Sequence, residues 1–190
     1  MTQIGKTGEY LTGKLLLALP GMGDERFDRA VIALFAHNPD GAFGIDVGHV
    51  RQGVTMHALL EDLDIDPGVA PDCPVHNGGP VEPQRGFVLH TPDWSDGDTM
   101  LAGPLCSLSA SLDVLRAIAE GRGPAQWLIA LGYSGWGAGQ LDNEMQFHGW
   151  HAAAGHADIL WTTPTTGRWA ATWRAEGIDP ALLTPQTGHA

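Results

Sequence analysis

The hydrophobic residues of the first fifty positions gather in short runs separated by polar, turn-forming residues. Leu15–Leu19, Ala30–Ala36 and Ala42–Val47 each have the length of a β-strand, and Pro20 stops the first of them. The Asn-Pro-Asp-Gly sequence between the second and third runs is typical of a type I turn. This pattern predicts a buried strand followed by a β-hairpin, with one helical turn over Asp24–Asp28 between them.

A different spacing, in which apolar residues recur at i, i+3, i+4 and i+7, predicts amphipathic helices. Residues 55–63 have this spacing, and the hydroxyl of Thr55 can cap the first turn. A second helix is predicted to begin with Ser109 as its cap and to end before a glycine. Two more helices are predicted over residues 138–147 and 165–175.

The remaining apolar runs predict further strands, so that about eight short strands and four or five helices are expected. Some strands follow one another directly and others alternate with helices, which favours an α+β fold over a doubly wound parallel sheet. We expect a single domain over residues 1–190, with a mixed, largely antiparallel β-sheet flanked by helices and with residues 1–9 and 186–190 loosely attached. The further strands are expected at Gly86–His90, Thr99–Leu105, Trp127–Leu131, Gly149–Ala153 and Asp158–Trp161.

Composition and charge narrow the classes of partner. Hydrophobic residues make up 43% and charged residues 17% of the chain, as in folded soluble domains. The net charge is -12, and no three of the ten lysines and arginines form a run. Because nucleic-acid affinity comes largely from clustered basic residues, we expect no direct contact with DNA or RNA. No apolar run reaches the roughly eighteen residues of a membrane span, and an acidic surface repels anionic membranes. We therefore expect a soluble, cytoplasmic protein.

Two further features agree with a cytoplasmic location. Cys73 and Cys106 form no C-x-x-C pair and no disulfide framework, which fits a reducing compartment. The apolar run Leu15–Pro20 is too short for the core of a signal peptide. We interpret both cysteines as small, buried apolar residues.

The segment GYSGW, residues 132–136, comes after a predicted strand and before a predicted helix, as the nucleophile elbow of a serine hydrolase does. The elbow sequence G-x-S-x-G requires a second glycine where this chain has Trp136. None of the later histidines can be singled out as the base. We interpret the segment as a glycine-rich turn anchored by Trp136, and keep a hydrolase with Ser134 as its nucleophile as a minor alternative.

Nine histidines raise the question of a metal site. The densest group is His148, His151 and His156, but it lacks the H-E-x-x-H arrangement, and Gly149 disfavours a helix that would bring the first two together. No phosphate-binding glycine motif is complete either. We therefore expect no metal, no cofactor and no catalytic residue set.

The stretch HNGGPVEPQRGFVLH, residues 76–90, concentrates glycines, prolines, histidines and an arginine. Gly78 and Gly79 can expose main-chain N–H groups, and Arg85 can bind a carboxylate or phosphate through two hydrogen bonds. One hypothesis is therefore an anion-binding corner within this stretch. The other is a tight chain crossing shaped by glycine and proline, in which Arg85 pairs with a local carboxylate such as Glu82.

Several segments together resemble the YqgE/AlgH family of small bacterial proteins. Members of that family typically show a strand and proline followed by D-x-x-F, then [E/A]-H-N and a G-A-x-G hairpin, later G-G-P-V with R-G-F-V-L-H, and finally A-L-G-Y-x-x-W with a G-Q-L-E-x-E helix. The resemblance covers the chain from about Tyr10 to Ala190. The matching segments are LLLALPGMGDERFDRAVIALFAHNPDGAFGI (15–45), HNGGPVEPQRGFVLHT (76–91), LIALGYSGWGAGQLDNEM (128–145), TTPTTGRW (162–169) and GHA (188–190).

The resemblance implies a cytoplasmic α+β protein with a mixed sheet and with an activity that is largely undefined. One branch of the family takes its name from a proposed role in regulating alginate synthesis, so similar proteins are often labelled transcriptional regulators. This chain departs from the family pattern at Asp46–His49, where relatives usually carry apolar residues and then Asn-[Arg/Lys]-Pro. A site served by that motif would be altered here, and strand alternation is expected to turn Asp46 outward. Ser134 stands where Ala is common, which weakens the hydrolase hypothesis.

We carry three functional hypotheses, in order of preference. The first is a regulatory or binding protein that acts through an unidentified protein partner rather than by direct DNA contact, with some of the seven tryptophans as anchors. The second is a small-ligand, anion-binding protein that uses the Gly79–His90 corner, and the third is the hydrolase. The second hypothesis predicts that its candidate residues converge on one pocket. These candidates are His76, Asn77, Gly78, Gly79, Arg85, His90, Tyr133, Trp136 and Gln140.

Overall fold

The structure is a computed structural model, and it describes residues 10–147 and 149–183. Within these residues, ten strands form one hydrogen-bonded sheet in which nearly all neighbouring pairs are antiparallel. The one parallel pair in this part of the chain joins β5 (Pro74–Asn77) to β9 (Trp127–Gly137). The predicted α+β class, with a mixed and largely antiparallel sheet flanked by helices, is confirmed.

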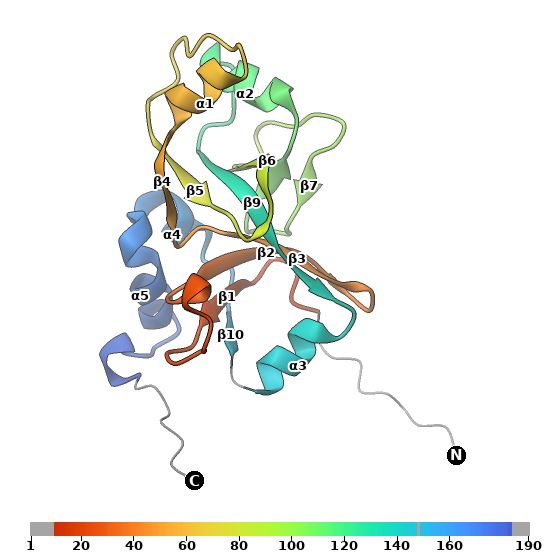
Figure 1. The fold of residues 1–190 in the computed structure, drawn as a ribbon, viewed down its shortest axis with the longest axis vertical. Coiled ribbons are helices and arrows are strands. Elements are labelled where there is room, and N and C mark those ends of the chain that lie inside the picture. Colours follow the sequence, from red (N-terminus) through yellow and green to blue (C-terminus); the bar gives the residue numbers. More distant parts are fainter. Residues whose placement is uncertain (1–9, 148, 184–190) are drawn as a thin grey trace.

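Four strands form one half of the sheet, in the order β10-β1-β2-β3 (Figure 1). β1 (Leu15–Ala18) is fully buried and pairs with β10 (Trp150–Ala153) on one side and with β2 (Val31–Asn38) on the other. β2 returns through a tight turn into β3 (Gly41–Asp46). The buried strand and the hairpin predicted from the apolar runs are therefore both present.

β9 joins this half of the sheet to the other half. Its C-terminal part pairs with β3 and its N-terminal part pairs with β6 (Val81–His90), so that a single strand runs through both halves (Figure 1). From β6 the sheet continues to β8 (Ser107–Ser109) and then to β7 (Met100–Leu101). β5 lies beside β9 and also pairs with β4 (Val50–Thr55).

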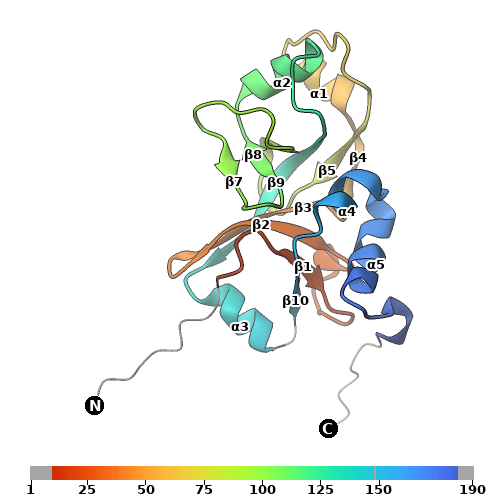
Figure 2. The ribbon, with the colours of Figure 1, turned by 180° about the vertical axis from the view of Figure 1, so that it is seen from behind.

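The helices lie at the two ends and along one side of this sheet, as Figures 1 and 2 show from opposite directions. Two helices lie together at the end formed by β4 to β8, namely α1 (Met56–Asp62) and α2 (Leu112–Ala119). At the other end lies α3 (Gln140–Gln146), and along the side lie α4 (Ala157–Thr162) and α5 (Thr165–Ala175). The described part of the chain also contains two short 3-10 helices, η1 (Glu25–Phe27) and η2 (Pro180–Leu182).

β1 is buried on both faces because successive side chains of a strand point to opposite sides. Leu15 and Leu17 pack in the core cluster that contains Trp173 of α5. Leu16 packs in a different cluster, which contains Trp136 and lies toward α3. Full burial of each leucine contributes roughly 2 kcal/mol. β1 therefore ties the α5 side of the molecule to the α3 side.

Several local predictions are confirmed in detail. α5 spans the eleven residues predicted for the last helix. α1 begins directly after Thr55, whose hydroxyl accepts a hydrogen bond from the Ala58 N–H. α3 lies within the predicted range 138–147, and η1 provides the helical turn predicted between the first two strands.

Other local predictions are wrong. The segment Asp158–Trp161 lies in α4 and is not a strand, because an apolar run of this length does not distinguish a strand from a buried helical turn. Only the two residues of β7 form a strand within Thr99–Leu105. Ser109 lies in β8, and the cap position of α2 is Ser111. The strands β4, β5 and β8 were missed altogether.

Candidate functional site

The glycines of the 76–90 stretch bring two main chains into close contact. Both Gly78 and Gly79 are buried, and the Gly78 N–H donates to the carbonyl oxygen of Leu131 at 2.9 Å. Gly79 has a φ of +149°, and a Cβ atom there would overlap the main chain of Tyr133. The stretch is a tight chain crossing against β9, and the N–H group of Gly78 is already used within the protein.

Arg85 lies on the exposed part of β6. Its Nη1 donates to Glu82 Oε2 at 2.9 Å, and its guanidinium lies 5.2 Å from the centre of the Phe87 ring. Both charged side chains are more than half exposed, so the pair contributes only about 0–1 kcal/mol. Arg85 has the local carboxylate partner that the sequence suggested. It lines an open pocket of about 490 Å³ in which Asp98 is a further carboxylate.

His90, Tyr133 and Asn77 lie in three further environments. The buried ring of His90 is hydrogen-bonded through Nε2 to Ser109 Oγ at 2.9 Å, and burial lowers the pKa of this histidine. Tyr133 packs against Phe43, with 5.0 Å between ring centres. Asn77 is exposed at the end of β5. The structure therefore distributes the sequence-predicted residues among separate surroundings and does not bring them to one pocket.

Ser134 does not lie on a strand-to-helix turn. β9 continues through the whole GYSGWG sequence to Gly137, so that the serine lies within the strand. The Ser134 side chain is 1% exposed, and its hydroxyl donates to Gly78 O at 3.4 Å. A nucleophile elbow presents its serine at an exposed, sharp turn. The interpretation of this segment as a turn is wrong, and the geometry required for the hydrolase alternative is not present at Ser134.

Asp46 is buried, contrary to the prediction that strand alternation turns it outward. Its Oδ1 accepts hydrogen bonds from the N–H groups of Val31 at 3.3 Å and Gly48 at 2.7 Å, and its Oδ2 lies 2.6 Å from His49 Nδ1. The hydrogen bond to this carboxylate raises the pKa of His49. The departure from the family pattern is thus a closed hydrogen-bonded unit, which compensates the burial of the carboxylate.

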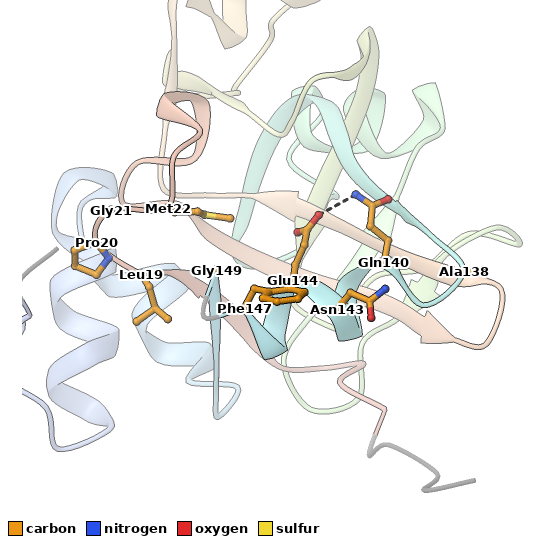
Figure 3. A pocket seen from close by; sticks show the side chains of 10 residues that line it. All are labelled: Leu19, Pro20, Gly21, Met22, Ala138, Gln140, Asn143, Glu144, Phe147 and Gly149. Atoms are coloured by element: carbon orange, nitrogen blue, oxygen red, sulfur yellow. Dashed lines mark hydrogen bonds between the residues drawn. The ribbon is translucent and has the colours of Figure 1, made fainter. Parts of the chain in front are cut away.

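Trp136 lies near the end of β9, and Gln140 is the first residue of α3. Glu144, one helical turn after Gln140, accepts hydrogen bonds on both carboxylate oxygens. Its Oε2 accepts from the indole N–H groups of Trp136 at 2.9 Å and Trp150 at 2.8 Å. Its Oε1 accepts from Gln140 Nε2 at 2.8 Å, as the dashed line in Figure 3 shows. One carboxylate therefore fixes α3 to two buried tryptophans.

Gln140 and Glu144 border an open pocket of about 870 Å³, which we call the α3 pocket. In Figure 3, Leu19 and Met22 come from the segment after β1, and Glu144 and Phe147 come from α3 and the residue after it. The side chain of Phe147 is 85% exposed. The pocket therefore combines apolar side chains from two segments with polar groups of α3.

The surroundings of the α3 pocket are acidic. A smaller pocket of about 310 Å³ shares part of the segment 19–22 with it and is also lined by Asp24, Glu25 and Asp28. Among the described residues, no lysine or arginine lines either pocket. Arg26, which lies between these acids in the sequence, is paired with Asp24 at 2.7 Å. We expect a negative potential over this part of the surface.

His76 lies in yet another place, buried beside the start of α5. Its Nδ1 is 3.1 Å from Ile129 O, and its Nε2 is 2.9 Å from Arg168 Nη1 and 3.1 Å from Thr165 Oγ1. Because the carbonyl oxygen can only accept a hydrogen bond and the guanidinium can only donate one, the neutral ring of His76 carries its proton on Nδ1. Burial, reinforced by the charge of Arg168, lowers the pKa of His76 to about 4, so the ring is neutral at neutral pH.

The histidines near the C-terminal part of the chain share a carboxylate. His151 Nε2 and His156 Nε2 lie 3.4 Å and 3.0 Å from the two oxygens of Glu176. Within residues 10–147 and 149–183, no group of three or more His, Cys, Asp or Glu side chains is arranged to hold a metal ion. His148, the third member of the predicted group, lies outside the described residues.

Three residues that line the pockets were not among the candidates predicted from the sequence, namely Glu144, Phe147 and Arg168. Glu144 is one helical turn from Gln140, a spacing at which side chains meet on a helix, so that this pair could have been predicted. The sequence pattern places Phe147 at the end of a predicted helix and gives no sign of its exposure. Arg168 is only 4% exposed, although arginine is a charged residue that usually lies at the surface. No local pattern in the sequence indicates this burial.

The fold and these pockets define an α+β protein with one mixed sheet and several open surface cavities. The family model described as AlgH-like matches residues 15–181, so this chain belongs to the AlgH-like family. A UPF0301 protein from Novosphingobium aromaticivorans is 64% identical over 182 residues, which cover 96% of this chain and 98% of the relative. A UPF0301 protein from Rhizorhabdus wittichii is 54% identical over 180 residues, which cover 95% and 97%.

Two solved structures have the same fold. The solution structure of the AlgH protein from Pseudomonas aeruginosa superposes with a TM-score of 0.75 at 38% identity, covering 100% of both chains. A crystal structure of a protein from Corynebacterium diphtheriae gives a TM-score of 0.71 at 23% identity, covering 94% of this chain and 91% of that one. The family resemblance seen in the sequence is thereby confirmed. In the described part of the chain, no helix is both long enough and apolar enough to cross a membrane.

Proposed function

We propose that this protein is a binding protein with a regulatory role that acts through a protein partner, and that the partner occupies the α3 pocket. The occupant is a segment with an apolar side chain flanked by lysine or arginine. The observation that carries the proposal is Phe147, a large aromatic side chain that is 85% exposed and lines a pocket with acidic surroundings.

The apolar side chain of the partner is inferred from the apolar residues on both sides of the α3 pocket. Burial of an exposed phenylalanine ring contributes roughly 2–3 kcal/mol, and aromatic side chains that fill pockets are frequent hot spots of protein interfaces. Leu19 and Met22 offer apolar surface from the segment after β1 (Figure 3). A partner side chain inserted here would contact apolar groups from two segments at once.

The charge of the partner follows from the acidic surroundings of the pocket. Asp24, Glu25 and Asp28 line the adjoining pocket, and Glu144 lines the α3 pocket itself. Complementary charges accelerate association and exclude like-charged partners. Salt screens such interactions, so binding is expected to weaken as the salt concentration rises.

Glu144 supports the pocket from within. Because both of its oxygens already accept hydrogen bonds from Trp136, Trp150 and Gln140, we assign it the role of holding the wall in place. A wall that is fixed before binding loses less conformational entropy when the partner arrives.

The distribution of basic residues supports action through a partner rather than by DNA contact. Four of the described arginines have a carboxylate neighbour within three residues, which reduces the positive charge they present to phosphates. These pairs are Arg26–Asp24, Arg85–Glu82, Arg116–Asp113 and Arg122–Glu120.

A photo-crosslinking amino acid at position 147 tests the proposal in the cells that make the protein. The matched control is position 182, because Leu182 is 78% exposed and lies in η2, away from the pocket. We expect a discrete crosslinked protein from position 147 that is not obtained from position 182. The same products from both positions, or none from position 147, would contradict the proposal.

The captured protein is then purified and titrated against variants of the pocket. Asn143→Lys places a cation in the pocket and leaves the helical hydrogen bond of the Asn143 main chain intact. We expect this variant to bind at least tenfold more weakly, and the wild-type affinity to fall with rising salt. An affinity that neither the added cation nor the salt concentration changes would refute the charged part of the proposal.

A further inference from the structure

A second pocket, which we call the α5 pocket, lies beside the first residues of β9. It has a volume of about 640 Å³ and shares no lining residue with the α3 pocket. Trp127 and Leu128 of β9, Trp161 of α4 and three prolines form much of its lining. Both tryptophans are partly buried, so each offers an indole face or edge to the cavity.

Arg168 is the charged side chain of this pocket, and it is only 4% exposed. A guanidinium has five N–H donors. Nη1 donates to Val47 O at 2.7 Å and to His76 Nε2 at 2.9 Å, and Nη2 donates to Leu160 O at 3.0 Å. Nε has no hydrogen-bond partner among the described residues. Two donors therefore remain without a partner among the described residues, one on Nε and one on Nη2.

The charge of Arg168 has no directly bonded carboxylate. In the part of the chain that the structure describes, its guanidinium forms no salt bridge, and its three acceptors are two carbonyls and a neutral ring. Asp46 acts on it at longer range, with oxygens already bonded to Val31, Gly48 and His49. Burial lowers the pKa of Arg168 to about 10, which leaves it charged at neutral pH. A buried cation of this kind is costly unless an anion approaches it.

The start of α5 adds to the preference for an anion. α5 is eleven residues long, and the positive end of its dipole lies at Thr165, whose hydroxyl is 3.1 Å from His76 Nε2. The cap position is Pro164, and among the described residues no side chain accepts a hydrogen bond from the first-turn N–H groups, of which that of Gly167 donates to Pro164 O at 2.9 Å. These donors lie on the same short segment as Arg168, and Thr165 and Pro164 also line the pocket.

We infer that the α5 pocket binds a small organic molecule with one negative charge and a flat apolar body. Its carboxylate or phosphate-type head pairs with the Arg168 guanidinium beside Thr165, both of which line the pocket. Its body packs against Trp127 and Trp161. Among the described lining residues Arg168 is the only lysine or arginine, so the pocket matches one anionic group and not a polyphosphate chain.

The pocket is a site for binding and not for covalent capture. Cys73 also lines it, but burial raises the pKa of this thiol to about 11. The thiol is therefore protonated at neutral pH, and a protonated thiol is a poor nucleophile. This inference uses none of the residues of the α3 pocket and does not depend on the proposed partner.

The test uses phenylacetate as the probe and follows the indole N–H signals of the full chain by NMR. 2-Phenylethanol is the uncharged comparison and acetate is the comparison without the apolar body. Arg168→Lys keeps the charge and removes the guanidinium group, and Arg116→Lys is the matched control on an exposed arginine. Trp161→Ala removes one wall of the pocket and leaves the buried arginine unchanged.

Phenylacetate is expected to shift the signals of Trp127 and Trp161, and to bind at least tenfold more tightly than either comparison compound. Arg168→Lys should weaken the binding of phenylacetate at least tenfold, and Trp161→Ala should weaken it at least threefold. Arg116→Lys should leave the affinity unchanged. The inference is overturned if phenylacetate causes no saturable shift, if 2-phenylethanol or acetate binds equally well, or if Trp161→Ala leaves the affinity unchanged. That last variant decides the outcome even if Arg168→Lys does not fold.

Discussion

Lowering the pH tests whether His76 is buried and neutral, and the expected loss of stability can be calculated from its lowered pKa. The ordinary pKa of histidine is about 6.5, and burial with the Arg168 charge nearby lowers that of His76 to about 4. Between these two pH values the unfolded chain binds a proton at this residue and the folded protein does not. Its contribution to stability is therefore complete above pH 6.5 and is lost as the pH falls toward 4.

The size of the effect follows from the shift. One proton changes the free energy of unfolding by about 1.4 kcal/mol per pH unit, so the interval from 6.5 to 4 corresponds to roughly 3 kcal/mol. The whole stability of a domain of this kind is about 5–15 kcal/mol. A loss of this size is large enough to measure.

Urea unfolding of the wild type and of His76→Asn, from pH 8 to pH 4.5, provides the assay. The asparagine amide can still donate to Ile129 O but does not titrate. We expect the wild type to be more stable at pH 8, and its advantage to shrink by about 2 kcal/mol at pH 4.5. Other titrating groups, including His90, are present in both proteins and cancel in the difference. An advantage that stays constant across this range would refute the buried, neutral state of His76.

Three further outcomes are expected. Gly79→Ala should lower the melting temperature much more than Gly53→Ala, because both glycines have positive φ but only at Gly79 would the Cβ meet main-chain atoms; equal effects would contradict the close crossing. The buried Cys106 should react with a thiol reagent at pH 8 far more slowly in the native protein than in urea, because burial raises its pKa to about 12; rapid native labelling of Cys106 would be inconsistent with that burial, and the half-buried Cys73, whose pKa burial raises to about 11, should be slowed less. Leu16→Ala should cost about 2–5 kcal/mol in urea unfolding, and a loss below 1 kcal/mol would argue against its fully buried position.

The elements that could be predicted from the sequence are those determined by neighbouring residues. The hairpin between β2 and β3 depends on a four-residue turn, and α1 depends on a cap and a repeated apolar spacing. β4 and β5 could not be predicted, because their sequences contain few apolar residues. β4 reads Val-Arg-Gln-Gly-Val-Thr and has no buried residue, and β5 begins with Pro74. β5 pairs with β9, which is distant in the sequence, and β4 pairs with β5.

The candidate sites could be predicted only in part, for the same reason. Trp136 and Gln140 were identified as candidates, but the group that joins them, Glu144, also needs Trp150 from a different strand. Arg168 is held by acceptors 121 and 92 residues away, at Val47 and His76. No local spacing indicates such contacts. The glycines of the 76–90 stretch correctly indicated a tight chain crossing, because the structure uses them to bring strands together.

The most direct test of the proposed function is a calorimetric titration of the partner captured at position 147 against the wild type, Phe147→Ser and Leu182→Ser. Both substitutions remove a large exposed apolar side chain, so neither is expected to disturb folding. If the partner occupies the α3 pocket, Phe147→Ser binds at least tenfold more weakly and Leu182→Ser binds like the wild type. Equal affinity of all three proteins would show that the partner binds elsewhere.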